Sequence, residues 1–146
     1  SPVFRFLRAI AAFPKPLVAA VCGPAVGVGT TMLLHCDLVY AGDNAAFSMP
    51  FVNLGLCPEA ASSLLVPRMF GMHRAAEALL LGEPFFAEAA QEVGLINRVV
   101  PPPEMRRKTE GGCAVSERPS DGAGIAFVLL AVCAAISRRR RSRRRS

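Results

Sequence analysis

The first hundred residues alternate between apolar positions at helical spacing and short continuous apolar runs, which predicts helices and strands in turn. Glycine and proline separate these stretches and set their ends. The predicted helices cover residues 3–12, 28–36, 59–69, 72–81 and 87–93, and the predicted strands cover 17–22, 37–42, 45–49 and 96–100. Because a strand, a helix and a strand follow one another from residue 17 to residue 42, we expect those two strands to pair in parallel. The alternating order indicates the α/β class.

The pattern changes after the three prolines that end at residue 103. Residues 105–124 are polar and glycine-rich without a period, residues 125–136 are apolar throughout, and residues 137–146 contain only arginine and serine. The apolar run is shorter than the roughly 20 residues that a membrane-spanning helix needs. We therefore predict two parts, a folded core over 1–103 and a disordered, low-complexity basic tail over 104–146 that is unrelated to the core.

The charge of the chain is divided in the same way. The formal net charge is +6, but residues 1–104 carry a net charge of −2 and residues 105–146 carry +8. The basic character therefore belongs to the tail and says little about the core. An arginine-rich end can bind nucleic acid. We favour a solvated, disordered tail instead, and we expect neither a nucleic-acid partner nor a membrane.

Cysteine and histidine usage argues against a metal site and against a disulfide framework. The five cysteines are odd in number, no two of them form a Cys-x-x-Cys pair, and the two histidines are far apart. Reduced, mostly buried thiols in a cytoplasmic protein are the simpler interpretation. The sequence has no secretory signal and begins without methionine, which is typical of an internal piece of a longer chain.

A glycine-flanked turn, Gly27-Val28-Gly29, lies between the strand over 17–22 and the helix over 28–36. Glycine lets the backbone approach a ligand closely, because no Cβ stands in the way. The first turn of a helix offers free N–H groups and a partial positive charge, which stabilise a phosphate or the oxygen of a polarised carbonyl. The turn lacks the last glycine of the dinucleotide fingerprint and the Gly-Lys-Ser/Thr of a P-loop. A role in packing alone stays open.

Glu59 is the strongest candidate for acid–base chemistry, because it is a carboxylate among apolar neighbours at a predicted helix start. A solvated first-turn glutamate is the alternative. Ser62 and Ser63 lack the Gly-x-Ser-x-Gly elbow of a serine hydrolase. We expect Asp37 to act as a cap or to form a structural hydrogen bond. Solvated or core-edge positions are expected for the remaining polar candidates, which are His35, His73, Arg68 and Arg74.

Four motifs within residues 3–103 resemble, in order, the crotonase superfamily of enoyl-CoA hydratases and isomerases. They are Lys15-Pro-Leu-Val-Ala-Ala-Val-Cys-Gly-Pro-Ala-Val-Gly-Val-Gly, His35-Cys-Asp-Leu-Val-Tyr-Ala-Gly, Ala46-Phe-Ser-Met-Pro-Phe and Gly94-Leu-Ile-Asn-Arg-Val-Val-Pro. The resemblance implies a spiral of ββα turns followed by a helical region that helps to build homotrimers. We therefore expect an α/β, crotonase-like ββα spiral that is partial, the central part of the core domain truncated at its N-terminus.

The resemblance also implies the chemistry. Family members act on acyl-CoA thioesters through an enolate, whose oxygen two backbone N–H groups hold. One of them corresponds to the N–H of Val28. The other comes from a segment upstream of the printed residues. Gly27, Gly29, Phe51, Leu56 and Pro58 are the expected substrate-binding residues. Coenzyme A is part of the substrate, so no separate cofactor and no metal are expected.

The carboxylates indicate a branch of the family. The two glutamates of hydratases fall on Thr31 and Phe51, which cannot transfer a proton as a carboxylate does. Gly55-Leu-Cys-Pro-Glu59 instead resembles the Δ3,Δ2-enoyl-CoA isomerases of fatty acid β-oxidation, in which one glutamate takes a proton from C2 and returns it at C4. Glu59 would be that general base. Enoyl-CoA hydratase activity and an inactive fragment or binding module are the alternatives.

Overall fold

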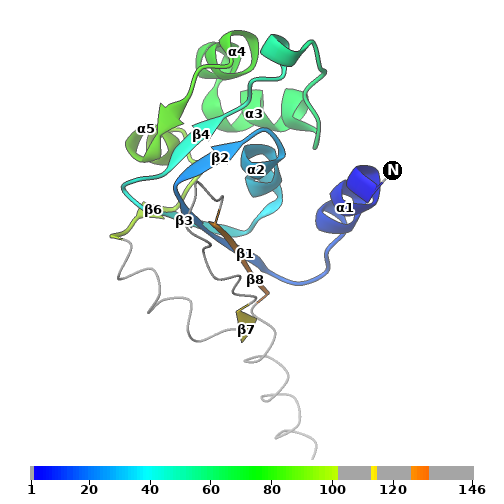
Figure 1. The fold of residues 1–146 in the computed structure, drawn as a ribbon, viewed down its shortest axis with the longest axis vertical. Helices are drawn as coiled ribbons and strands as arrows, with labels where there is room; N and C mark the ends of the chain where they lie inside the picture. The colour runs from blue at the N-terminus through cyan, green and yellow to red at the C-terminus, as the bar shows by residue number, and fades with distance from the viewer. Residues whose placement is uncertain (1, 102–112, 115–125, 132–146) are drawn as a thin grey trace, which may run out of the picture.

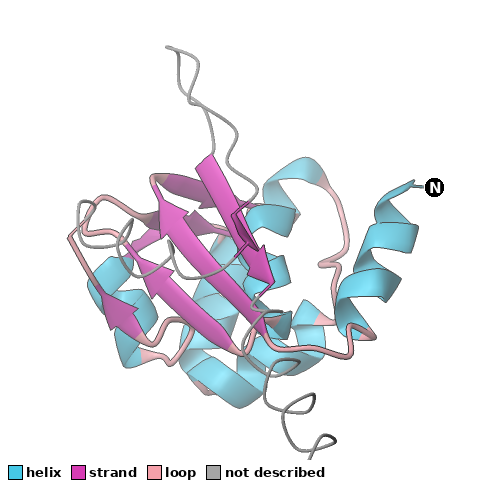
Figure 2. Cartoon of the chain, turned by 90° about the horizontal axis from the view of Figure 1, so that it is seen from below, coloured by secondary structure: helices cyan, strands magenta, loops and turns pink. Residues whose placement is uncertain are grey.

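The computed structural model describes residues 2–101, 113–114 and 126–131. Two sheets form its centre, and the helices gather against one face of the larger sheet (Figures 1 and 2). The first part contains α1 Pro2–Ala11, β1 Leu17–Cys22, β2 Pro24–Val26, α2 Val28–Thr31, the 3-10 turn η1 Met32–His35, β3 Leu38–Ala41, β4 Ala46–Ser48 and the 3-10 turn η2 Val52–Leu54. The second part contains α3 Ser62–Phe70, α4 Met72–Ala76, the π-helical η3 Glu77–Leu81, β5 Phe85–Phe86, α5 Ala87–Glu92, β6 Arg98–Val99, β7 Cys113–Ala114 and β8 Ala126–Ala131.

Two ββα units follow each other along the chain and stack in space. The first consists of β1, β2 and α2, and the second of β3, β4 and α3. Equivalent strands pair in parallel, β1 with β3 in the larger sheet and β2 with β4 in the smaller one. Val18 lies opposite Leu38 at one end of the first pairing and Val21 lies opposite Ala41 at the other. The predicted parallel pairing and the α/β class are confirmed.

Asp37 fixes the point at which the first unit passes into the second. The amide of Leu17 donates to Asp37 Oδ2 at 2.7 Å, and the amide of Asp37 donates to the carbonyl of Leu17 at 2.8 Å. These two hydrogen bonds, one to the side chain of Asp37 and one from its backbone, tie the start of β1 to the start of β3. The structural hydrogen bond expected of Asp37 is confirmed.

Strands β2 and β5 are absent from the sequence prediction. The smaller sheet has the order β2-β4-β5, so β2 is an edge strand. Gly23-Pro24 is typical of a chain break, but proline is tolerated in an edge strand because one side of that strand needs no ladder hydrogen bonds. The two-residue β5 is too short to leave a periodic pattern in the sequence.

The helix predicted to begin at Glu59 begins at Ser62. Ala60 and Ala61 have φ values of 54° and 56°, in the left-handed region, so the chain cannot enter a right-handed helix before them. Glu59 therefore lies in a loop and not in a first helical turn. Other predicted elements keep their place but change form: the helix over 28–36 becomes α2 and η1, the helix over 72–81 becomes α4 and η3, and the strand over 96–100 shortens to β6.

Two of the three hydrophobic clusters among the described residues meet at an aromatic group. Phe47 and Leu33 belong to the first cluster, and Met49 and Val66 belong to the second. The ring of Phe85 stacks on Phe47 with centroids 5.7 Å apart and meets Phe70 edge-on at 5.8 Å. Such pairs stabilise a core beyond the area that they bury.

Strand β8 lies along the side of β1 that β3 leaves free. The two run antiparallel, with Leu17 opposite Ala131 and Cys22 opposite Ala126, and β7 pairs with β8 in turn. Both strands come from the segment 104–146 that the sequence assigns to the tail. The rest of that segment lies outside the described residues, so the division at residue 103 stays a prediction. Among the described helices, none is long and apolar enough to cross a membrane.

Candidate active site

An apolar cavity of about 500 Å³ lies between α1 and the loop that precedes α3. In Figure 1, α1 stands to one side of the molecule, next to α2. One wall comes from α1 and is formed by Phe4, Leu7, Arg8 and Ala11. The opposite wall is formed by His35 and by the consecutive residues Cys57, Pro58, Glu59, Ala60 and Ala61. Cavities of this size and polarity are typical of small-molecule sites.

Among the described residues that line the cavity, Glu59 supplies the only carboxylate, and its two oxygens differ. The hydroxyl of Thr31, a fully buried residue, donates a hydrogen bond to Glu59 Oε1. Oε2 is buried and has no hydrogen-bond partner. Among the described residues, it is the one buried side-chain polar atom without such a partner. A buried acceptor without a donor is costly, and such atoms are rare outside functional sites. The carboxylate is therefore fixed at one oxygen and has no hydrogen-bond donor at the other.

The turn before α2 holds the helix that carries Thr31. Gly27 has a φ of 58°, which favours glycine, and its carbonyl accepts hydrogen bonds from the amides of Thr30 at 2.9 Å and Thr31 at 3.0 Å. The hydroxyl of Thr30 donates to the carbonyl of Ala25 at 2.6 Å. Val28 is the first residue of α2, a position whose N–H has no acceptor within a helix. The side chain of Thr31 thus ties Glu59 to the helix that begins at Val28.

The loop of Glu59 has further anchors. The amide and the hydroxyl of Ser62 both reach the carbonyl of Glu59, at 3.0 Å and 2.5 Å. His35 Nε2 lies 2.8 Å from the carbonyl oxygen of Ala60. His35 ends η1, and Ser62 begins α3, so elements on both sides of the loop hold its backbone.

The structure brings only part of the predicted site together. Pro58 and Glu59 line the cavity. The predicted residues that are not among those lining it are Gly27, Val28, Gly29, Phe51 and Leu56. Phe51 belongs to the core cluster of Met49 and Val66, and Leu56 is 58% exposed. Sequence reasoning missed Thr31 and His35 as partners of the Glu59 loop. Their spacing of four residues indicates that the two side chains share one helical face, but it does not indicate the distant loop that they contact.

The described cysteines are more exposed than the expected mostly buried thiols. None of Cys22, Cys36 and Cys57 forms a disulfide, and Cys57 is exposed. Burial, with the Asp37 carboxylate as a smaller cause, raises the pKa of the Cys36 thiol to about 11. Burial and then Asp43 raise the pKa of Cys22. Within the described ranges, no group of three or more His, Cys, Asp or Glu side chains is placed to hold a metal ion.

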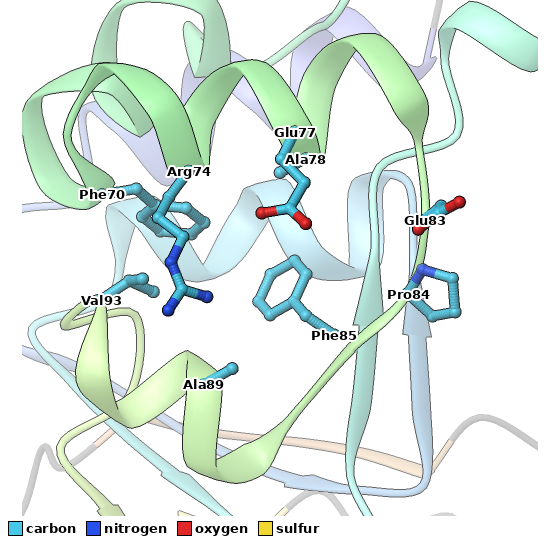
Figure 3. A pocket seen from close by; sticks show the side chains of 9 residues that line it. All are labelled: Phe70, Arg74, Glu77, Ala78, Glu83, Pro84, Phe85, Ala89 and Val93. Carbon is cyan, nitrogen blue, oxygen red and sulfur yellow. The ribbon is translucent and has the colours of Figure 1, made fainter.

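A second pocket, of about 90 Å³, is a weaker candidate (Figure 3). Arg74 and Glu77 extend from the helical segment above it, and Phe85 forms part of its wall. Arg74 forms an ion pair with Glu92 at 3.6 Å, and these two side chains are 54% and 69% exposed. Exposed ion pairs contribute little and are screened by salt. Without a buried, unpartnered polar group, this pocket offers no comparable chemistry.

The chain is similar to known enzymes over most of its described length. A family model described as enoyl-CoA hydratase/isomerase matches residues 1–116. Enoyl-CoA delta isomerase 2 of Rattus norvegicus is 49% identical over 97 residues, which are 66% of this chain and 25% of that protein. The 2,3-dehydroadipyl-CoA hydratase of Escherichia coli (strain K12) is 43% identical over 90 residues, 62% of this chain and 35% of that protein.

A solved structure gives the same likeness in three dimensions. The enoyl-CoA hydratase/isomerase of Pseudoalteromonas atlantica T6c superposes with a TM-score of 0.71 at 48% identity, over 73% of this chain and 43% of that one. The likeness confirms the predicted fold, of which the chain holds a part. The chain spans only 25% and 35% of the two curated relatives.

Proposed function

Because the chain belongs to the enoyl-CoA hydratase/isomerase family, we propose that it acts on an unsaturated acyl-CoA thioester and moves the double bond from C3 to C2. Glu59 is the general base of this reaction. One observation carries the proposal: among the residues that the structure describes, Glu59 supplies the only carboxylate of the cavity wall, and its buried Oε2 has no hydrogen-bond partner there. A single base that moves a single proton needs no second carboxylate.

The proposed reaction conserves atoms and charge. Glu59 Oε2 takes a proton from C2, and the electrons of that C–H bond move into the thioester carbonyl to give an enolate. The family resemblance assigns the enolate oxygen to the amide of Val28, which begins α2 and is not among the residues lining the cavity. A donor there stabilises the charge where it develops. The protonated carboxyl then returns its proton to C4 while the double bond re-forms between C2 and C3. The hydrogen bond from Thr31 holds the base in place during both transfers.

Water addition by two carboxylates is the main alternative. The resemblance puts the two hydratase glutamates at Thr31 and Phe51. The hydroxyl of Thr31 already donates to Glu59, and Phe51 is only 7% exposed in the core. Neither residue carries a carboxylate that could hold a water molecule for attack at C3. This difference supports isomerisation over hydration for this chain.

The remaining parts of the proposal follow from the family. The substrate brings its own coenzyme A, so we propose no separate cofactor. Self-association into trimers, a place in fatty acid β-oxidation and a cytoplasmic location stay predictions. The same holds for the division of the chain into a core over 1–103 and a tail over 104–146.

The test is turnover of 3-enoyl-CoA by the full chain in water enriched in oxygen-18. We expect 2-enoyl-CoA to form without incorporation of the heavy oxygen. A 3-hydroxyacyl-CoA that carries the label would overturn the proposal in favour of a hydratase. A folded chain that binds the acyl-CoA but leaves its double bond in place would overturn it in favour of an inactive binding module.

A further inference from the structure

We propose that His35 is a positioning residue that holds the backbone of the Glu59 loop in a strained conformation, and so keeps the carboxylate on the cavity wall. The inference rests on the proposed function for its catalytic meaning. The contacts that support the inference are observed in the structure and do not depend on the proposed reaction.

The loop next to Glu59 has the strained backbone. Ala60 and Ala61 are the two described residues other than glycine with positive φ. A Cβ makes the left-handed region unfavourable, and two such residues in succession are unusual. Strained backbone persists where surrounding contacts over-determine it, and it clusters at functional sites. Some contact must therefore hold these two alanines.

His35 supplies that contact on the side of the cavity. A carbonyl oxygen can only accept, so the 2.8 Å contact requires that Nε2 of His35 carry the hydrogen and donate to Ala60. His35 is half-buried at the end of η1 and lines the cavity beside the loop. Its bond falls on the carbonyl of the first strained residue, directly after Glu59.

The same short segment also holds the side chain of Glu59. Thr31 and His35 are four residues apart across α2 and η1. Thr31 donates to the carboxylate, and His35 donates to the backbone one residue later. Ser62 bonds to the carbonyl of Glu59 from the far side of the loop. The side chain and the main chain of Glu59 are thus fixed by separate hydrogen bonds. If the His35 hydrogen bond is lost, the Thr31 hydrogen bond alone should leave the Glu59 carboxylate mobile.

The first test compares His35→Leu with His35→Gln in the full chain. The amide nitrogen of glutamine can donate from nearly the position of Nε2, whereas leucine cannot donate. We expect His35→Leu to lower kcat about tenfold with KM within twofold, and His35→Gln to recover most of that loss. His73→Leu, at an exposed position on α4, is the matched control. Equal kcat values for the leucine and glutamine variants would overturn the proposal.

The second test needs no substrate, so its failure is distinct from failure of the proposed function. Ala60→Gly removes the Cβ that makes the loop strained, and we expect it to raise the urea midpoint of the wild-type chain. In the His35→Leu background the loop is free to relax, so the same substitution should raise the midpoint much less. Equal gains in both backgrounds would mean that the loop keeps its conformation without His35, which overturns the inference.

Discussion

The two oxygens of the Glu59 carboxylate have different surroundings, and this difference is the main support for the proposed function. Glu59 Oε1 accepts a hydrogen bond from Thr31, while Oε2 is buried and unpartnered. The first contact fixes the side chain, and the second atom is the one that takes the substrate proton in the proposed reaction. This asymmetry supports the proposal that Glu59 is a general base and does more than complete a structural network.

Thr31→Val tests the fixed oxygen, because valine has the shape of threonine without its hydroxyl. We expect the free energy of unfolding to fall by about 1–3 kcal/mol, since the carboxylate would lose its donor in a buried setting. Urea unfolding measures the change, and Thr31→Ser, which keeps the hydroxyl, is the control. An unchanged midpoint for the valine variant would show that the hydrogen bond contributes nothing to stability.

The thiols of the chain should react at different rates. Cys57 is exposed on the cavity wall, while burial raises the pKa of Cys36 to about 11. Alkylation requires the thiolate, so at pH 8 we expect Cys36 to react at least about tenfold more slowly than Cys57. Because its pKa is raised, the rate at Cys36 should increase with pH until about pH 11.

Peptide mapping by mass spectrometry after iodoacetamide treatment measures both rates. A saturating acyl-CoA should protect Cys57 and leave the labelling of Cys22 unchanged, because Cys57 lines the cavity and Cys22 is not among its lining residues. Equal labelling of Cys36 and Cys57 at pH 8 is the result that this account does not allow.

The sequence predicts Glu59 as the candidate base but does not predict its hydrogen-bond partners, for a physical reason. A proline followed by a carboxylate among apolar residues is a local pattern. The contacts with Thr31 and His35 cross 28 and 25 residues of chain, and no periodicity of one element reports such a contact. The expectation of a solvated or core-edge His35 was therefore incomplete, because that expectation considered only its near neighbours.

Helices and strands were predicted best where a single pattern covers the element. Helix α1 and strand β1 match their predicted ranges to within a residue at each end, since an amphipathic or continuous apolar pattern spans each of them. The start of α3 was wrong by three residues, because the left-handed conformations of Ala60 and Ala61 leave no mark in composition. Strand β2 was missed because its proline is tolerated only through its place at a sheet edge.

Strand β8 gives a prediction about the edge of β1. Six residues of β1 pair with β8, so removal of β8 leaves one side of β1 without partners. We expect a chain ending at residue 125 to lose about 2–3 kcal/mol of unfolding free energy and to self-associate through the open edge. A chain ending at residue 131 keeps β8 and is the matched control.

Urea unfolding and light scattering of the two shortened chains show whether the β1–β8 pairing stabilises the fold or whether the tail contributes nothing to stability. If both chains are equally stable and monomeric, the β1–β8 pairing does not contribute to the fold in solution. That outcome would support the division into a core and an independent tail that the sequence predicts.

Taken together, the chain carries two successive ββα units of a larger family fold. The four motifs were sufficient to predict the family: three lie on the strands and turns of these two units, and the fourth contains β6. The cavity could not be predicted, since its walls come from α1 and from a loop about 50 residues later. Its chemistry depends on the juxtaposition of those two segments and not on either one alone.

Proton transfer by Glu59 is the central claim, and the most direct measurement compares wild-type chain and Glu59→Gln on 3-enoyl-CoA. We expect formation of 2-enoyl-CoA to fall by about 10²–10⁴-fold in the variant, because the amide cannot accept the C2 proton. The dissociation constant of the acyl-CoA should stay within about threefold, since glutamine keeps the size of the side chain. A variant that isomerises the substrate at the wild-type rate would contradict the assignment of Glu59 as the base.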